Sequence, residues 1–160
     1  MENISSYFLY PSAIFASKEP YNISTILGSC VAVCMWDPIL KYGGMSHYML
    51  PLWNGEGLAS PKYGNIAIEK LLGKMISFGS KKNSIVAKIF GGGEVLDTET
   101  QYFQIGERNI KLALETLEEL RIPIVSSSVG GKYGRKIIMN TVSGEIKQRY
   151  VKREIKEIKK

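Results

Sequence analysis

The chain has 160 residues, enough for one domain of ordinary size and too few for two. Hydrophobic residues make up 44% of it and charged residues 22%, a balance that supports a buried core and excludes a disordered chain. The longest apolar run, residues 30–36, is far shorter than the roughly 18 residues of a membrane-spanning helix. The first residues also lack the pattern of a signal peptide. We therefore expect a single domain over 1–160, located in the cytoplasm and without membrane insertion.

The net charge of +6 is concentrated at the C-terminal end. Residues 1–131 carry 11 Lys and Arg against 12 Asp and Glu, whereas residues 132–160 carry 10 against 3. A nucleic-acid-binding surface would interleave basic and aromatic residues, which this end does not do, so no nucleic-acid partner is expected. We expect 152–160 to be a basic, frayed tail. Electrostatic steering towards an acidic protein is the alternative.

The N-terminal half of the chain predicts strands. Residues 6–15 favour a strand interrupted by Pro11, and residues 23–36 favour an extended segment, a bend at Gly28 and a buried strand. Residues 45–50 favour a further strand. It pairs with the preceding one as a hairpin whose long loop begins at Asp37 and ends with Gly43 and Gly44.

Two helices and further strands follow. Ser60 and Pro61 are typical of a helix start, and apolar residues then recur at helical spacing until Gly79. A second helix is predicted over 106–120, with an inward face of Ile110, Ala113, Leu114 and Leu117. Strands are predicted over 84–90, 122–127, 136–142 and 145–151. This order predicts an α/β or α+β fold, with a mixed sheet packed by two main helices.

The residue types present and their spacing disfavour nucleotide and metal sites. The glycines at 91–93 follow a strand, but the lysine and the spacing of a phosphate-binding loop are absent, so a backbone bend is the favoured interpretation. His47 is the single histidine, and Cys30 and Cys34 lack the spacing of zinc ligands. On a strand these two cysteines are also too far apart for a disulfide. No cofactor or metal is expected.

Cys30 and His47 are the candidate reactive pair. Cys30 begins a strand directly after the flexible Gly28 and Ser29, where a sulfur at the sheet edge would lie beside backbone N–H donors. An imidazole nearby would activate the thiol. The alternative is a core histidine with inert cysteines. A hairpin symmetrical about residue 40 would place His47 opposite Cys34, so spacing alone leaves both interpretations open.

Five segments of the sequence closely resemble the chemotaxis protein family CheD. In chain order they are LGSCVAVC at 27–34 followed by DP at 37–38, GMSHYMLP at 44–51, KIFGGG at 88–93, IGERN at 105–109 and GGKYGR at 130–135. They cover roughly residues 23–145. One such segment would be weak evidence, whereas five in the family's order are strong evidence.

The resemblance implies a cysteine enzyme that deamidates glutamines of methyl-accepting chemotaxis receptors in their cytoplasmic helical region. It implies an α/β layered sandwich related to the deamidase domain of cytotoxic necrotising toxins. Cys30 matches the family's nucleophile and His47 its general acid/base. For the hydroxyl that orients the histidine we name Ser24 first, with Thr25 as the alternative, and the amides of Ser29 and Cys30 as oxyanion donors. A CheC-type phosphatase is the second partner implied.

Two other functions remain as alternatives. One is a non-catalytic, CheD-like adaptor that binds and stimulates a CheC-type response-regulator phosphatase and for which Cys30 is dispensable. A different cysteine acyl-transfer activity, such as peptide cleavage, would show itself by its products.

Overall fold

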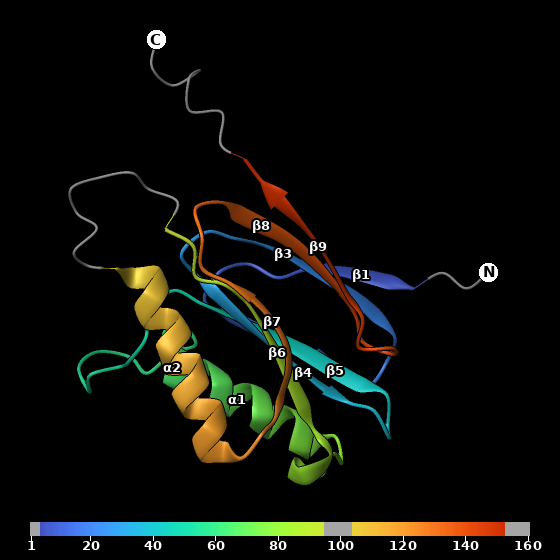
Figure 1. Ribbon diagram of the computed structural model, residues 1–160. Coiled ribbons are helices and arrows are strands. Elements are labelled where there is room, and N and C mark those ends of the chain that lie inside the picture. Colours follow the sequence, from blue (N-terminus) through green and yellow to red (C-terminus); the bar gives the residue numbers. More distant parts are fainter. Residues whose placement is uncertain (1–3, 95–103, 153–160) are drawn as a thin grey trace.

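The structure, a computed structural model, describes residues 4–94 and 104–152. Its strands form two sheets (Figure 1). The five-stranded sheet has the order β2 (Ala13–Ser17), β5 (Tyr42–Tyr48), β4 (Val31–Asp37), β6 (Val86–Gly91) and β7 (Ile124–Val129). The four-stranded sheet has the order β1 (Ser5–Phe8), β3 (Tyr21–Leu27), β8 (Gly134–Asn140) and β9 (Ile146–Val151). Both sheets mix parallel and antiparallel pairs.

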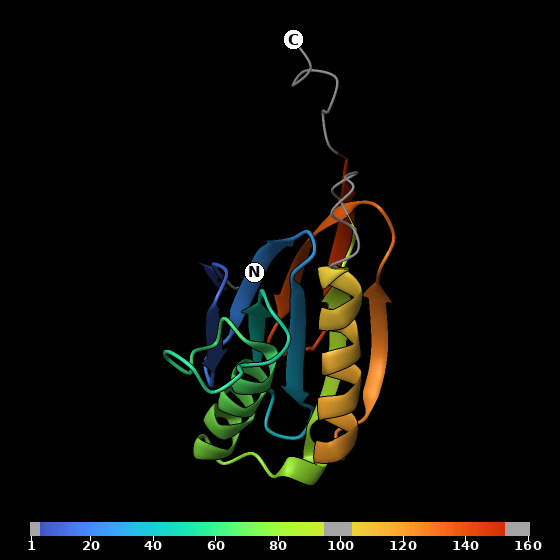
Figure 2. The same ribbon diagram turned by 90° about the vertical axis from the view of Figure 1, so that its left-hand side faces the viewer.

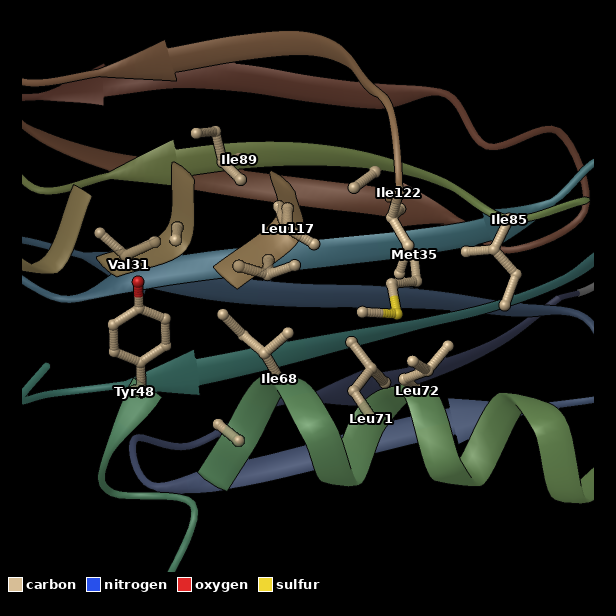
Figure 3. Close-up of a cluster of buried hydrophobic side chains, with 14 of the residues drawn as sticks. Val31, Met35, Tyr48, Ile68, Leu71, Leu72, Ile85, Ile89, Leu117 and Ile122 are labelled. Atoms are coloured by element: carbon tan, nitrogen blue, oxygen red, sulfur yellow. The ribbon is translucent and has the colours of Figure 1, made fainter. Parts of the chain in front are cut away.

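Two helices, α1 (Gly64–Ser77) and α2 (Ile105–Leu120), cover the outer face of the five-stranded sheet (Figures 1 and 2). A 3-10 turn, Lys82–Ser84, precedes β6. On β4, Val31, Val33 and Met35 face these helices, and in Figure 3 Ile68 and Leu71 of α1 point towards them. The alternate residues Ala32 and Cys34 face the four-stranded sheet. The result is a sandwich of helices, sheet and sheet.

The predicted fold class is confirmed, with the strands divided between two sheets where one was expected. The relation to the toxin deamidase fold stays a prediction. Within the described residues, no helix is long and apolar enough to span a membrane. Of the basic tail expected over 152–160, only Lys152 lies within the described part of the chain.

The predicted start of the first helix at Ser60 is wrong. The helix begins at Gly64, after Tyr63 in extended conformation. Main-chain hydrogen bonds explain the delay: Lys62 O accepts from the amides of Met49 and Leu50, and Gly64 N donates to Leu50 O. Residues 62–64 are thus tied to the end of β5, and this pairing overrides the local preference for a helix start.

The inward face of α2 differs from the predicted one. Leu114 is 46% exposed, whereas Asn109, Leu112 and Thr116 are buried beside the expected Ala113 and Leu117. Two polar residues therefore belong to the packed face, which the apolar spacing alone had left out.

The loop between β4 and β5 is short, so the prediction that Gly43 and Gly44 belong to it is wrong. Asp37 pairs directly with Tyr42, and the Asp37 carboxylate accepts from the amides of Ile39 and Leu40. Both glycines lie within β5 and are buried. They are needed for space: a Cβ on Gly44 would lie 2.6 Å from Ala16 Cβ and 2.8 Å from Leu71 Cδ1.

We expect Gly44→Ala to lower the free energy of unfolding by about 1–3 kcal/mol, since α1 and β2 must move to admit the methyl group. Gly73→Ala is the matched control. Gly73 is an exposed residue of α1 with open space around its Cα, so alanine should raise stability by about 0.5–1 kcal/mol. Urea unfolding of the two variants checks both signs, and equal stability of Gly44→Ala and wild type would contradict the packing argument.

Candidate active site

The candidate site lies between the two sheets, where β3, β4 and β5 come together. Side chains alternate along a strand, so residues two apart share a face. On β3, Thr25 lies between Ile23 and Leu27, and all three are buried in the intersheet space. On β5, His47 pairs with Ala32 of β4, which faces the same space.

His47 is held by a chain of two hydrogen bonds. Its Nδ1 lies 2.7 Å from Thr25 Oγ1, and the Thr25 hydroxyl donates to Leu9 O, also at 2.7 Å. A hydroxyl has one proton. Because that proton is directed to Leu9 O, Thr25 Oγ1 must accept from His47 Nδ1–H. The tautomer is therefore fixed, and Nε2 carries the free lone pair.

The Nε2 atom of His47 is buried and has no hydrogen-bond partner among the described residues. A proton there would create a charge with no acceptor, and burial lowers the pKa of His47 from 6.5 to about 4. At neutral pH the imidazole is thus a neutral base with an unused lone pair.

This lowered pKa predicts acid sensitivity. The pKa of His47 is about 4 in the folded protein and near 6.5 in the unfolded chain. The contribution of the neutral imidazole to the free energy of unfolding is therefore fully present above pH 6.5 and is lost as the pH falls towards 4. We expect wild type to lose about 3 kcal/mol more stability between pH 7 and pH 4 than His47→Gln. Urea unfolding at both pH values measures the difference. Parallel curves for the two proteins would contradict it.

Cys30 lies immediately before β4 and is half-buried. It packs against the intersheet cluster and is two residues from Ala32, the partner of His47. The symmetrical register considered for the hairpin, with His47 opposite Cys34, is therefore wrong, and the observed register moves His47 towards Cys30. Burial raises the pKa of the Cys30 thiol, and the backbone N–H of Cys30 acts in the opposite direction.

Cys34 differs from Cys30 in its surroundings. It is buried in the middle of β4, and burial raises the pKa of its thiol to about 12 despite the nearby charge of Lys88. Neither cysteine forms a disulfide. Residues 4–94 and 104–152 also contain no group of three or more His, Cys, Asp and Glu side chains placed to hold a metal ion.

Ser24, the hydroxyl named first from the sequence, does not face His47. It neighbours Thr25 on β3 and so points to the opposite face of the four-stranded sheet, as does the exposed Ile26. Thr25, the alternative, is the residue whose hydroxyl contacts the imidazole. The preference for Ser24 is corrected on this geometry.

The carbonyl groups of the bend before β4 are all occupied. Gly28 O accepts from Gly93 N at 2.9 Å, and Cys30 O accepts from Gly92 N at 2.8 Å. Gly92 has a φ of 70°, which favours glycine, so the predicted backbone bend at 91–93 is confirmed as a close approach to this segment. The amides of Ser29 and Cys30 donate to no backbone carbonyl of the described residues, as oxyanion donors require.

Asn109 is a site residue to which the sequence analysis gave no role. Its side-chain Nδ2 donates to Ser29 O and to Met49 O, both at 3.0 Å. Its main-chain carbonyl oxygen accepts from the hydroxyl of Tyr48. The available signal was a polar side chain among the apolar residues of a predicted helix.

A groove of about 450 Å³ adjoins the site on the side of the helices. It is lined by Leu50, Pro51, Leu52 and Tyr63 and by the α2 residues Ile105, Arg108, Lys111, Leu112 and Glu115. Its first lining residue, Leu50, follows Met49 in the sequence, so the groove lies next to the end of β5 that carries His47. Neither Cys30 nor His47 lines it.

A thiol just before a strand, a neutral imidazole of fixed tautomer and two backbone amides without a carbonyl acceptor among the described residues suit nucleophilic acyl transfer. Residues 49–150 match the family described as CheD chemotactic sensory transduction. Similar proteins from Trichlorobacter lovleyi and Sulfurimonas denitrificans, each named probable chemoreceptor glutamine deamidase CheD, are 54% identical over 143 residues and 46% identical over 147. The alignments cover 89% and 91% of this chain, and 89% and 94% of those relatives. The chain belongs to the CheD family.

Proposed function

We propose that this protein is a protein-glutamine deamidase, an amide hydrolase that converts glutamines of chemotaxis receptors to glutamates. The observation that carries the proposal is the lone pair on His47 Nε2, whose tautomer is fixed by Thr25 and Leu9, on the strand paired with β4, which Cys30 immediately precedes. The names of the relatives support the substrate, a chemoreceptor glutamine. The residue types and their arrangement supply the reaction class.

The reaction starts from an uncharged pair. The pKa of the Cys30 thiol is raised and that of His47 is lowered, so at neutral pH the pair rests as thiol and imidazole. His47 Nε2 accepts the thiol proton as the sulfur attacks the carboxamide carbon of the glutamine. Thr25 and Leu9 support the imidazolium through the hydrogen bond at Nδ1.

The tetrahedral intermediate carries a negative oxygen. The amides of Ser29 and Cys30 are the proposed donors to it, because they have no backbone carbonyl acceptor within residues 4–94 and 104–152. The imidazolium then gives its proton from Nε2 to the amide nitrogen, and ammonia departs as the thioester forms. Without this proton the nitrogen would be a very poor leaving group.

Hydrolysis completes the cycle. His47 Nε2 takes a proton from water, whose oxygen attacks the thioester carbon, and the thiol is released with the returned proton. The sum is one water consumed, one ammonia released and one glutamine converted to glutamate. The chain's own residues account for each proton in this scheme, so we propose no cofactor.

The receptor's cytoplasmic helical region is the proposed substrate, and the cytoplasm is accordingly the proposed location. A CheC-type phosphatase is proposed as a second partner. The names of the relatives support the receptor as partner, whereas the phosphatase is proposed from the resemblance of the sequence alone.

The test uses a purified receptor cytoplasmic fragment with its encoded glutamines intact. Peptide mass spectrometry after incubation should show glutamine-to-glutamate conversion at specific sites with wild type and none with Cys30→Ala. Intact glutamines on several cognate receptors, with CheC binding retained, would overturn the proposal in favour of an adaptor. Cleaved peptides would indicate a different acyl-transfer activity.

A further inference from the structure

Asn109 connects three parts of the site that are distant in the sequence. It lies in the second turn of α2 and is fully buried. Its one amino group serves two main-chain oxygens: Ser29 O, next to the nucleophile, and Met49 O, two residues beyond His47. Its other polar atom, Oδ1, is buried without a hydrogen-bond partner among the described residues. The position of the amide is therefore set by the two carbonyls that its nitrogen serves.

The contact to Ser29 determines where the Cys30 amide points. In a trans peptide the C=O of one residue and the N–H of the next point in opposite directions, and no peptide bond of the described residues is cis. Ser29 O is directed towards Asn109, so the N–H of Cys30 is directed away from α2. The same reasoning applies one residue earlier, where Gly93 holds Gly28 O and turns the N–H of Ser29.

The second contact ties this bend to the strand of the base. Met49 O belongs to the residue that follows β5, and Met49 N is itself held by Lys62 O. Asn109 thus bridges the segment that presents the thiol and the segment that presents the imidazole. The backbone pairing between β4 and β5 ends at Val31 and Tyr48, so Asn109 connects the two segments just beyond the end of that pairing.

We propose that Asn109 is a positioning residue that orients the Ser29–Cys30 peptide, so that the Cys30 amide serves as an oxyanion donor, and that fixes this peptide relative to the strand of His47. The inference rests on the proposed function and deepens it. Burial raises the pKa of the Cys30 thiol, and the N–H of Cys30, the group whose direction this peptide sets, acts in the opposite direction.

The chemistry of asparagine fits this task. An amide nitrogen has two protons in one plane and can donate to two acceptors at once. Aspartate has the same shape, but an ionised carboxylate only accepts, so it would turn an oxygen towards two carbonyl oxygens. Alanine leaves both carbonyls without their donor. The hydroxyl of Tyr48 bonds the main chain of residue 109, so α2 keeps this anchor in both variants.

The experiment compares Asn109→Ala and Asn109→Asp with Thr116→Ala. Thr116 is a buried polar residue on the same face of α2, two turns further on, and it serves as the matched control for loss of packing. We expect both Asn109 variants to lower kcat for receptor deamidation by about 10²-fold, with KM changed less than threefold. Thr116→Ala should keep kcat within threefold of wild type. Thermal unfolding is recorded for each protein, and the isosteric aspartate variant serves if the alanine variant does not fold.

A second readout does not depend on deamidation. The rate of alkylation of Cys30 by iodoacetamide is measured against pH by mass spectrometry, with the buried Cys34 as the internal reference. We expect the Asn109 variants to move the Cys30 profile to higher pH, because the N–H no longer faces the sulfur, and Thr116→Ala to leave it unchanged. If the wild type deamidates no receptor but the Asn109 variants still shift the alkylation profile of Cys30, the proposed function is refuted and the positioning role is kept. Wild-type kcat and an unshifted profile in Asn109→Ala would overturn the inference, as would losses that follow the melting temperature equally in Asn109→Ala and Thr116→Ala.

Discussion

Cys30→Ala is expected to abolish receptor deamidation, with a fall in kcat of at least about 10⁴-fold, because no other group in the site can form the thioester. The measurement is release of ammonia together with peptide masses of the receptor fragment. The fold should survive, since Cys30 is only half-buried at the entrance of β4 and alanine fits the same backbone.

Cys34→Ala is the matched control, because it removes the same group from the same strand. Cys34 is buried, and the pKa of its thiol, about 12, keeps it protonated. We expect normal kcat and a loss of about 1 kcal/mol in stability from the missing sulfur. If activity were lost in Cys34→Ala and kept in Cys30→Ala, the nucleophile would be Cys34 and the assignment to Cys30 would be wrong.

Thr25→Val should lower kcat by about 10²-fold or more, because the imidazole loses the acceptor that fixes its tautomer and supports its charge. Valine has nearly the shape of threonine, so the loss measures the hydroxyl rather than its volume. Thr25→Ser keeps a hydroxyl and should recover much of the activity. The measurement is kcat for deamidation, with folding followed by circular dichroism.

Ser24→Ala distinguishes the two neighbouring hydroxyls. Ser24 points to the outer face of its sheet, so this variant should deamidate the receptor at the wild-type rate. A large loss in Ser24→Ala, with Thr25→Val active, would return the orienting role to Ser24.

The resemblance predicted Cys30 and His47 as the catalytic pair, which stays a prediction. It named Ser24 first as the orienting hydroxyl, whereas in the structure the hydroxyl that contacts His47 is that of Thr25. Strand alternation offered a signal, since Ile23, Thr25 and Leu27 form one set and Asn22, Ser24 and Ile26 the other. The exposed Ile26 weakened that signal by placing a large apolar residue on the outer face. Which face of β3 is buried depends on the second sheet, and sequence spacing does not contain that information.

The distance between the thiol and the imidazole depends on the register of β4 and β5. That register is set by a short turn at 38–41, in which Asp37 holds two amides and Lys41 adopts a φ of 63°. Gly43 and Gly44 resembled loop residues because glycine is common in turns. Their actual role is to let β2, α1 and β8 approach β5, a tertiary cause that a local pattern does not reveal.

The order of helices and strands was predictable, whereas Asn109 was not. The apolar periodicity located α2 to within one residue of its start. The role of a buried amide comes from the main-chain oxygens around it, and these belong to segments 80 and 60 residues away in the sequence.

The hydrogen-bond chain from His47 ends on Leu9 O, which is an atom of the main chain. Every residue type carries that oxygen, so no single codon change at position 9 deletes it. The apolar side chain of Leu9 is fully buried in the cluster between the sheets, and this packing holds its carbonyl in place. A change from one aliphatic side chain to another at position 9 therefore leaves the hydrogen-bond donors and acceptors of the site unaltered. Thr25, in contrast, has only serine as a substitute of equivalent chemistry.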